Sequence, residues 1–501
     1  MSRHAKFVAA DLGASNGRVM VGQWDGNRFS LEELHRFPNG AISAEEGLYW
    51  DVLGIWGHLQ EGMTKYRARF GDSPDGIGVD AWGVDFGLLD KCGRLIGNPF
   101  HYRDRRTQGV PAHLFATVAE REVFTATGTQ TMEINTLFQL YSMVQKKDVQ
   151  LAWADKLLMI PDLFLYFLSG EKNVEYTAAT TTQMYSLTER TWAERVLKKV
   201  GISTALFPKV ISPGTVLAPV RLDVLRHCGF EKPIPAIAVA SHDTASAVAA
   251  IPNMDASSAF ISSGTWSLIG VEAAEPNTSD EAMRLNFTNE GGADGAVLLL
   301  KNITGLWTLH QCMHHWKLRG QDIQWIDIIR AASAAKVRSL FDPDDGRLQV
   351  QSDMPAAIQS YCRGTRQAVP ETIGEIARCA FESLSLKYRS ALESLELLTG
   401  RDLRILRVVG GGCLNTFLCQ MTADACNRLV VAGPVEASAL GNVMLQAIAT
   451  GHLRDIQTGR AAIAASVECV SYEPRPSAAW DEASAKFKCL ESRLDAYTLK
   501  H

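Results

Sequence analysis

The polar run Ser241-His242-Asp243-Thr244 carries residue types that proton-transfer chemistry uses. Apolar residues 233–240 before it predict a buried strand, and small residues 244–250 after it predict a helix. Because open α/β sheets present groups to ligands at such strand ends, the Asp243 carboxylate is a candidate acceptor for the proton of a bound hydroxyl. The alternative is structural, since aspartate is also a favoured helix N-cap.

Two glycine-containing turns have the composition of phosphate-binding loops. The first, residues 11–18, joins predicted strands 6–10 and 19–22 and ends with a cationic residue, Arg18. The second, Ser262-Ser263-Gly264-Thr265, occupies the equivalent turn of a downstream hairpin. Backbone N–H groups in concave turns bind phosphate oxygens, so two such loops could hold one polyphosphate. Ordinary hairpin turns are the alternative, because Asn-Gly is a preferred turn dipeptide.

Glycines follow two further predicted strands. Gly410-Gly411-Gly412 lies between strand 403–409 and helix 414–425, where missing side chains allow a base or ribose to approach the backbone. The spacing does not complete G-x-G-x-x-G, and the chain has no G-x-x-x-x-G-K-[ST] motif, which disfavours dinucleotide and P-loop sites.

Gly83 permits a small ligand to approach. Its neighbours Trp82 and Phe86 are either core residues or a wall of that site.

His310 and His314 have the i, i+4 spacing that places two imidazoles on one helical face. No glutamate completes an H-E-x-x-H motif, so the sequence favours a solvated or ligand-facing helix over a metal site.

The elements that must position these residues alternate between strands and helices, which indicates an α/β architecture. Residues 373–395 keep a helical apolar period and Gly400 can terminate that helix. The apolar stretch 157–168 is interrupted by Pro161 and predicts a buried helix. A length of 501 residues favours two domains, which we expect at 1–248 and 249–501.

The overall composition excludes several classes of protein. Hydrophobic residues at 46% and charged residues at 21% are typical of globular proteins. A formal charge of -5, from 50 basic and 55 acidic residues, creates no general attraction for nucleic acid or anionic membranes. The ten cysteines form no Cys-x-x-Cys pair and no signal peptide is recognisable, so a cytoplasmic location is expected. A monomer and a small homo-oligomer both remain open.

Taken in order, these segments resemble the FGGY family of carbohydrate kinases over nearly the whole chain. Besides the loops above, the resemblance rests on residues 78–86, 102–104, 175–183 and 289–292. It implies two actin-like (ribonuclease H-like) α/β domains with a catalytic cleft between them, and ATP and Mg²⁺ as cofactors. The expected reaction is phosphorylation of L-rhamnulose at its 1-hydroxyl in L-rhamnose catabolism. A kinase for L-fuculose or another ketose or polyol, and a noncatalytic actin-like ATP-binding protein, are the alternatives.

The resemblance also implies roles for individual residues. Asp243 would accept the proton, and Asp11 would lie near Mg²⁺, through water. The residues expected around the sugar are Gly83, His242, Asp243, Thr244 and Asn302. Those expected around ATP are Ala14, Ser15, Asn16, Gly17, Arg18, Thr265, His310 and Gly411. Close relatives can present a glutamine to the nucleotide where this chain has His310.

Overall fold

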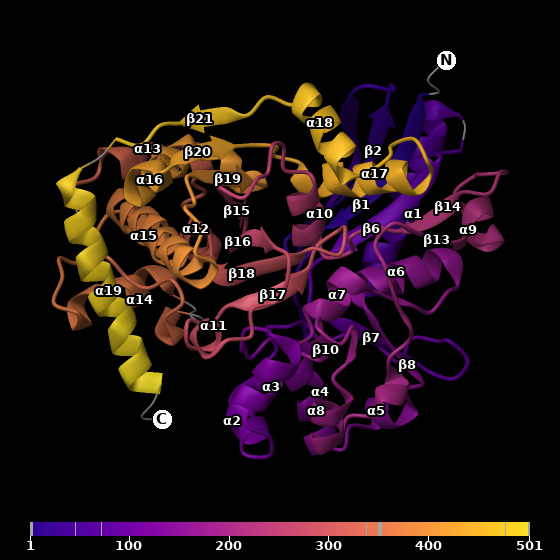
Figure 1. Ribbon diagram of the computed structural model, residues 1–501, viewed down its shortest axis with the longest axis horizontal. Coiled ribbons are helices and arrows are strands. Elements are labelled where there is room, and N and C mark those ends of the chain that lie inside the picture. The colour runs from indigo at the N-terminus through magenta and orange to yellow at the C-terminus, as the bar shows by residue number, and fades with distance from the viewer. Residues whose placement is uncertain are drawn as a thin grey trace. The chain divides into compact units, whose positions relative to one another are not determined.

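The computed structural model describes residues 4–45, 47–71, 73–336, 338–348, 353–475 and 477–498. These residues divide into two compact units (Figure 1). The first unit comprises Met1–Asn253, Glu272–Leu299 and Glu436–Val467, and the second comprises Met254–Val271, Leu300–Val435 and Glu468–His501. The predicted boundary after residue 248 lies near the end of the first continuous segment, and two later segments return to the first unit.

A six-stranded mixed sheet forms the centre of the first unit, in the order β13-β14-β6-β1-β2-β3. Its strands are β1 (Ala5–Leu12), β2 (Asn16–Trp24), β3 (Phe29–Pro38), β6 (Gly76–Ala81), β13 (Thr215–Pro219) and β14 (Pro235–Ala238). β1 pairs antiparallel with β2 and parallel with β6, and β6 pairs parallel with β14. Every residue of β6 and all but one of β1 are buried, as expected for strands covered on both faces.

Helices cover both faces of this sheet. They are α1 (Val52–Phe70), α6 (Ile160–Ser169), α10 (Asp243–Ala249) and α17 (Ala437–Ala449). Figure 1 shows α17, late in the chain, beside the indigo strands β1 and β2. α17 approaches closely because Gly22 and Gly78 have no side chain where Val443 and Asn442 lie. Val19 faces Gly62 of α1 instead, which places α1 on the opposite face.

A second apolar core of the first unit lies under its shorter elements. These elements include α2 (Val110–Phe115), α3 (Glu120–Thr127), α4 (Thr136–Gln145), α7 (Tyr176–Thr180), α8 (Glu194–Lys199), β7 (Phe86–Leu89), β8 (Lys156–Met159) and β9 (Val174–Glu175). The apolar stretch predicted to be a buried helix forms β8 and then α6, with Pro161 in the first turn of α6. No helix among the described residues is both long and apolar enough to cross a membrane.

The second unit repeats the pairing pattern of the first. Its strands are β15 (Ser258–Ser263), β16 (Trp266–Ala273), β18 (Val297–Thr304), β19 (Ile405–Val409), β20 (Leu429–Ala432) and β21 (Val470–Tyr472). They follow the order β18-β16-β15-β19-β20-β21. β15 pairs antiparallel with β16 and parallel with β19, β19 pairs parallel with β20, and β20 pairs antiparallel with β21. This common pattern agrees with the two actin-like domains that the family resemblance implies.

The helices of the second unit include α12 (Trp307–Leu318), α13 (Trp325–Ala334), α14 (Met354–Gly364), α15 (Ile373–Thr399), α16 (Thr416–Cys426) and α19 (Ala478–Thr498). The predicted helix over 373–395 is confirmed as α15. A capping box between Thr372 and Glu375 begins it, and Gly400 ends it in the left-handed conformation with φ 65°. α15 packs against α13, α16 and α19.

Candidate active site

Asp243 is the first residue of α10, and the N-cap position belongs to His242. The Asp243 Oδ1 atom accepts hydrogen bonds from the adjacent Thr244, at 2.6 Å from its backbone N–H and 3.3 Å from its hydroxyl. An N-cap side chain would instead bond to the second or third helical N–H, so the capping interpretation is wrong. Oδ2 has no hydrogen-bond partner among the described residues, and the side chain is 30% exposed. One carboxylate oxygen can therefore accept a proton.

The surroundings of Asp243 make its carboxylate a stronger base than usual. Burial raises the pKa of Asp243, and the nearby charge of Asp11 raises it further, while His242 and the Thr244 hydrogen bonds act in the opposite direction. A carboxylate with a raised pKa accepts a hydroxyl proton more readily.

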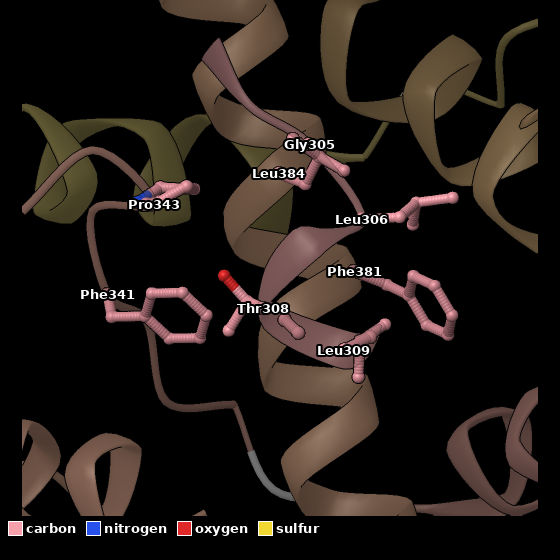
Figure 2. A pocket seen from close by; sticks show the side chains of 9 residues that line it. Gly305, Leu306, Thr308, Leu309, Phe341, Pro343, Phe381 and Leu384 are labelled. Carbon is pink, nitrogen blue, oxygen red and sulfur yellow. The ribbon is translucent and has the colours of Figure 1, made fainter. Parts of the chain in front are cut away.

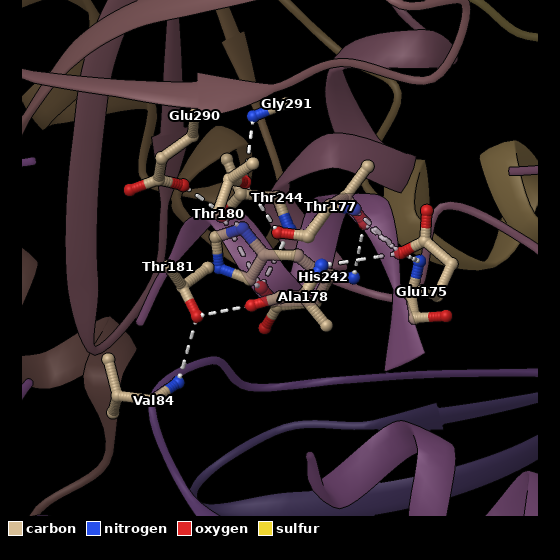
Figure 3. Close-up of polar contacts among 12 residues, drawn as sticks. Val84, Glu175, Thr177, Ala178, Thr180, Thr181, His242, Thr244, Glu290 and Gly291 are labelled. Atoms are coloured by element: carbon tan, nitrogen blue, oxygen red, sulfur yellow. Dashed lines mark hydrogen bonds and ion pairs between the residues drawn. The ribbon is translucent and has the colours of Figure 1, made fainter. Parts of the chain in front are cut away.

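His242 lies between the carboxylates of Glu290 and Asp243, and Figure 3 shows its contact with Glu290. Its Nδ1 is 3.2 Å from Glu290 Oε2, and its Nε2 is 3.5 Å from Asp243 Oδ1. Burial lowers the pKa of His242, but the hydrogen bond and charge of Glu290 outweigh burial and the net shift is upward. The imidazole is thereby held in one orientation with a positive charge favoured beside Asp243.

Glu175 holds the polypeptide just before Asp243. Its carboxylate accepts hydrogen bonds from the backbone N–H groups of Thr177 at 2.9 Å and Ser241 at 3.0 Å. The first of these caps α7, and the second ties α7 to the strand end that leads into α10 (Figure 3). Burial raises the pKa of Glu175 to about 7.

Replacing Glu175 with glutamine should remove a pH dependence of stability. The folded chain retains the Glu175 proton up to about pH 7, whereas the unfolded chain loses it near the ordinary pKa of 4.5. The folded state therefore binds more protons, and the free energy of unfolding falls as pH rises through that window. Urea unfolding at pH 5 and pH 7.5 should show that the free energy of unfolding of wild type falls by about 2 kcal/mol more than that of Glu175→Gln over this range. A constant difference between the two proteins would contradict the assignment.

Backbone pairing brings three strand ends together in the first unit. Asp11 of β1 lies opposite Asp80 of β6, and Ala81 forms a bridge with His242. The residues expected to follow these strands, Gly83 and Asp243 among them, therefore belong to neighbouring strand ends.

The turn around Gly83 is held in a strained conformation. A Cβ atom at Gly83 would lie 3.0 Å from Thr181, and Val84 has φ 65°, which is rare for a β-branched residue. Thr136 donates to the Val84 carbonyl at 2.6 Å and secures the turn. Strain of this kind is concentrated at functional sites. Trp82 is buried and donates to Asp85 at 3.1 Å, which favours the core interpretation for Trp82.

The first predicted phosphate loop forms a closed turn. The Gly13 N–H donates to the Asn16 carbonyl at 2.9 Å, and Ser15 and Asn16 are exposed at its tip. Arg18 pairs with both Asp11 and Glu436. Gly17 is buried, and the Phe37 ring occupies the space that a Cβ atom would need. The glycine at 17 is thus required by packing.

Carboxylates accumulate behind this loop. Asp80 is fully buried, and its Oδ2 accepts a hydrogen bond from the Asn442 side chain at 2.6 Å. Burial raises the pKa of Asp80, and the charges of Asp11 and Asp243 raise it further. A hard cation such as Mg²⁺ binds oxygen ligands and relieves the repulsion between neighbouring carboxylates. These residues therefore fit the expected metal.

The second predicted phosphate loop has a comparable turn. The Gly264 N–H donates to the Trp266 carbonyl at 2.8 Å, and the Thr265 carbonyl accepts from the Trp307 N–H at 3.1 Å. Gly410 has φ 82°, and a Cβ atom at Gly412 would collide with Ser263. A Cβ atom at Gly411 would meet no other atom within 4 Å, so the space beside the Gly411 backbone is open. That space fits the approach of a nucleotide.

Asn302 and His310 complete the predicted residues of the second unit. Asn302 lies on β18 and is half-buried. His310 lies on α12 with its ring edge against Trp325, and burial lowers its pKa. Among the described residues, His310 and His314 do not belong to a cluster of three potential metal ligands.

A small pocket lies at the start of α12 (Figure 2). Its lining is mostly apolar and includes Leu306, Leu309, Phe341, Phe381 and Leu384, with the Thr308 hydroxyl as its polar side chain. None of the predicted site residues, all of which the structure describes, lines this pocket. It therefore adds nothing to the candidate site.

Four acidic residues of the site were not predicted individually, namely Asp80, Glu175, Glu290 and Glu436. Asp80 carried a detectable signal, since a carboxylate inside the apolar run Ile77 to Trp82 must be buried if that run is a strand. Glu175 and Glu290 fall within segments that carry the family resemblance. Glu436 had no local signal, because it meets Arg18 across 418 residues of chain.

Comparisons with known proteins agree with this architecture. Residues 7–250 match the FGGY family of carbohydrate kinases, N-terminal domain, and residues 259–450 match its C-terminal domain. A rhamnulokinase from Bacteroides thetaiotaomicron is 43% identical over 96% of this chain and 98% of its own. One from Klebsiella pneumoniae subsp. pneumoniae is 41% identical over 97% of this chain and 98% of its own.

A solved structure supports the fold. The gluconate kinase from Lactobacillus acidophilus superposes with a TM-score of 0.79 at 17% identity, over 99% of this chain and 98% of that chain. The predicted fold of two actin-like α/β domains is confirmed, while the boundary between 1–248 and 249–501 stays a prediction. The chain belongs to the FGGY family of carbohydrate kinases.

Proposed function

We propose that this chain transfers the γ-phosphoryl group of ATP to the 1-hydroxyl of L-rhamnulose, giving L-rhamnulose 1-phosphate and ADP. The observation that carries the proposal is the match to rhamnulokinases at 41–43% identity along almost their full length. The geometry around Asp243 supports it, because a partly exposed carboxylate with a raised pKa is suited to accept a hydroxyl proton.

In this proposal most of the sugar-binding residues lie at the strand ends of the first unit. Asp243 accepts the proton of the attacking hydroxyl through Oδ2, and Thr244 holds Oδ1 in place. His242, oriented by Glu290, donates a hydrogen bond to a sugar oxygen. The backbone at Gly83 and the amide of Asn302 supply the remaining sugar contacts.

The proposed nucleotide residues lie on the two hairpin turns and the glycine turn. Ala14, Ser15, Asn16, Gly17, Arg18 and Thr265 would contact phosphate oxygens, and Gly411 and His310 would contact the nucleoside. For Gly17 this means a backbone contact, since Phe37 fills its side-chain space. Asp11 would hold Mg²⁺ through water. When bound, Mg²⁺ would neutralise the negative charge of the phosphates and so favour transfer.

A substrate panel tests the proposed function directly. The full-length chain is supplied with MgATP and one acceptor at a time, and ADP release is coupled to NADH oxidation. We expect kcat/KM for L-rhamnulose to exceed that for L-fuculose, L-ribulose and glycerol by at least about tenfold, since one well-placed hydrogen bond to a substrate hydroxyl accounts for such a ratio.

The panel also separates the alternatives. A preference for L-fuculose or another ketose would reassign the substrate and leave the family chemistry intact. ADP release that no acceptor stimulates would instead favour an actin-like protein that hydrolyses ATP as a conformational switch. Mass analysis of the product must show one added phosphoryl group on the sugar.

A further inference from the structure

Two histidines and a glutamate meet on the far side of the first sheet from α17. His35 lies on β3, and His58 and Glu61 lie one turn apart on α1. The His35 Nε2 atom is 3.0 Å from His58 Nδ1 and 3.4 Å from Glu61 Oε2, and His58 Nδ1 is 3.8 Å from Glu61 Oε2. Three donor atoms of the types that transition metals prefer therefore face one another.

The spacing of these atoms matches a tetrahedral metal. Zinc binds imidazole nitrogen and carboxylate oxygen at about 2.0–2.2 Å, which places tetrahedral ligands about 3.3 Å apart. The three observed distances average close to that value, and a single point about 2.0 Å from all three atoms exists at the centre of their triangle. An ion slightly above that point would meet all three ligands with its fourth position open to water. Two imidazoles do not suit Mg²⁺, which prefers oxygen ligands.

Regular secondary structure fixes the three side chains. His35 pairs with Val19 across β2 and β3, and the same Val19 packs against Gly62 of α1, so the strand and the helix are in contact next to the cluster. The Phe37 ring stacks on His58 with centroids 4.4 Å apart and an interplanar angle of 11°. The His35 side chain is 10% exposed and that of His58 is 40% exposed, so an ion from solvent can reach the site.

Lys65 competes with a metal ion for His35 and Glu61. Its Nζ lies 2.8 Å from His35 Nδ1 and 2.8 Å from Glu61 Oε1. A lysine that donates to Nδ1 leaves the proton of the neutral imidazole on Nε2, the atom that faces His58 and Glu61. To bind a metal through Nε2, His35 must shift that proton to Nδ1 and Lys65 must turn away. The side chain of Lys65 is 44% exposed and has room to do so.

We propose that His35, His58 and Glu61 form a binding site for a zinc-class divalent metal ion, distinct from the Mg²⁺ that accompanies ATP, and that Lys65 weakens it. The site has three protein ligands, with Glu61 bound through Oε2, and one open position. Nothing in the proposal depends on the sugar that the chain phosphorylates.

Metal titration of the full-length chain tests the proposal. The exposed thiols of Cys92, Cys469 and Cys489 are first alkylated, because they would bind the probe. Cobalt(II) is then added and its visible absorption followed, with zinc(II) calorimetry as a second readout. We expect one site in the wild-type chain that is at least about tenfold weaker in His58→Ala and in Glu61→Gln.

Two further variants, Lys65→Gln and His314→Ala, serve as controls for the titration. Lys65→Gln should bind several-fold more tightly, a gain that damage to the fold would not produce. His314→Ala, which removes an exposed histidine of α12, should leave the titration unchanged. Titrations of His58→Ala and Glu61→Gln that match wild type would overturn the proposal, as would weaker binding by Lys65→Gln.

Discussion

Asp243→Asn should lower kcat for sugar phosphorylation by about 10²–10⁴-fold while leaving the fold intact. The amide has nearly the shape of the carboxylate, and its oxygen can still accept the hydrogen bond from the Thr244 N–H. It cannot accept the hydroxyl proton, because its remaining group is an NH₂ donor. Initial rates at saturating ATP and sugar measure the loss, and circular dichroism checks the fold.

The matched control for this variant is Asp223→Asn. Asp223 also lies in the first turn of a helix, α9 (Leu222–His227), but its side chain is 65% exposed and pairs with Arg221. Loss of a carboxylate near a helix N-terminus is thus common to both variants, and its effect on stability is about 0.3–1 kcal/mol. A kcat for Asp243→Asn close to that of Asp223→Asn would remove Asp243 from the reaction.

Gly441→Ala should destabilise the chain by about 1–3 kcal/mol and reduce activity with it. Gly441 is buried in α17, and a Cβ atom there would collide with the backbone carbonyl of Ser246 in α10. Backbone cannot rotate aside as a side chain can, so the two helices must separate. α10 begins with Asp243, so the separation displaces the proposed base. Urea unfolding and kcat measure the two effects.

Gly57→Ala provides the opposite case. Gly57 is an exposed residue of α1, and a Cβ atom there meets nothing within 4 Å. Alanine is the better helix former, so this variant should be unchanged or about 0.4–1 kcal/mol more stable. If Gly441→Ala and Gly57→Ala had the same free energy of unfolding, the close contact between α10 and α17 would not be the reason that position 441 requires glycine.

Local patterns predicted the elements that form from local interactions. The two hairpins, the strand before Asp243 and the helix ended by Gly400 were all predictable, because strand periodicity, turn residues and helix caps act over a few residues. Asp243 itself could be singled out from its position between a strand and a helix. Its role as a cap could not be rejected from sequence, since that depends on which N–H its oxygen meets.

Contacts between segments that are distant in the chain could not be predicted from the sequence. His242 meets Glu290 across 48 residues, which are joined by no recognisable pattern. The sequence of α17 predicts an apolar helix. Its composition does not indicate that the helix packs on β1 and β6 rather than within the second unit. The positive φ of Val84 was equally hidden, because β-branched residues ordinarily avoid it.

The return of α17 to the first sheet has a consequence for biosynthesis. When the ribosome has made residues 1–253, the strands β1, β2 and β6 are all present, but the helix that covers one of their faces is almost two hundred residues away. Until residue 449 has emerged, the small side chains that receive α17 border an uncovered apolar surface. A nascent chain in this state is the natural client of a chaperone that binds hydrophobic segments. The N-terminal half is therefore synthesised first but completed late.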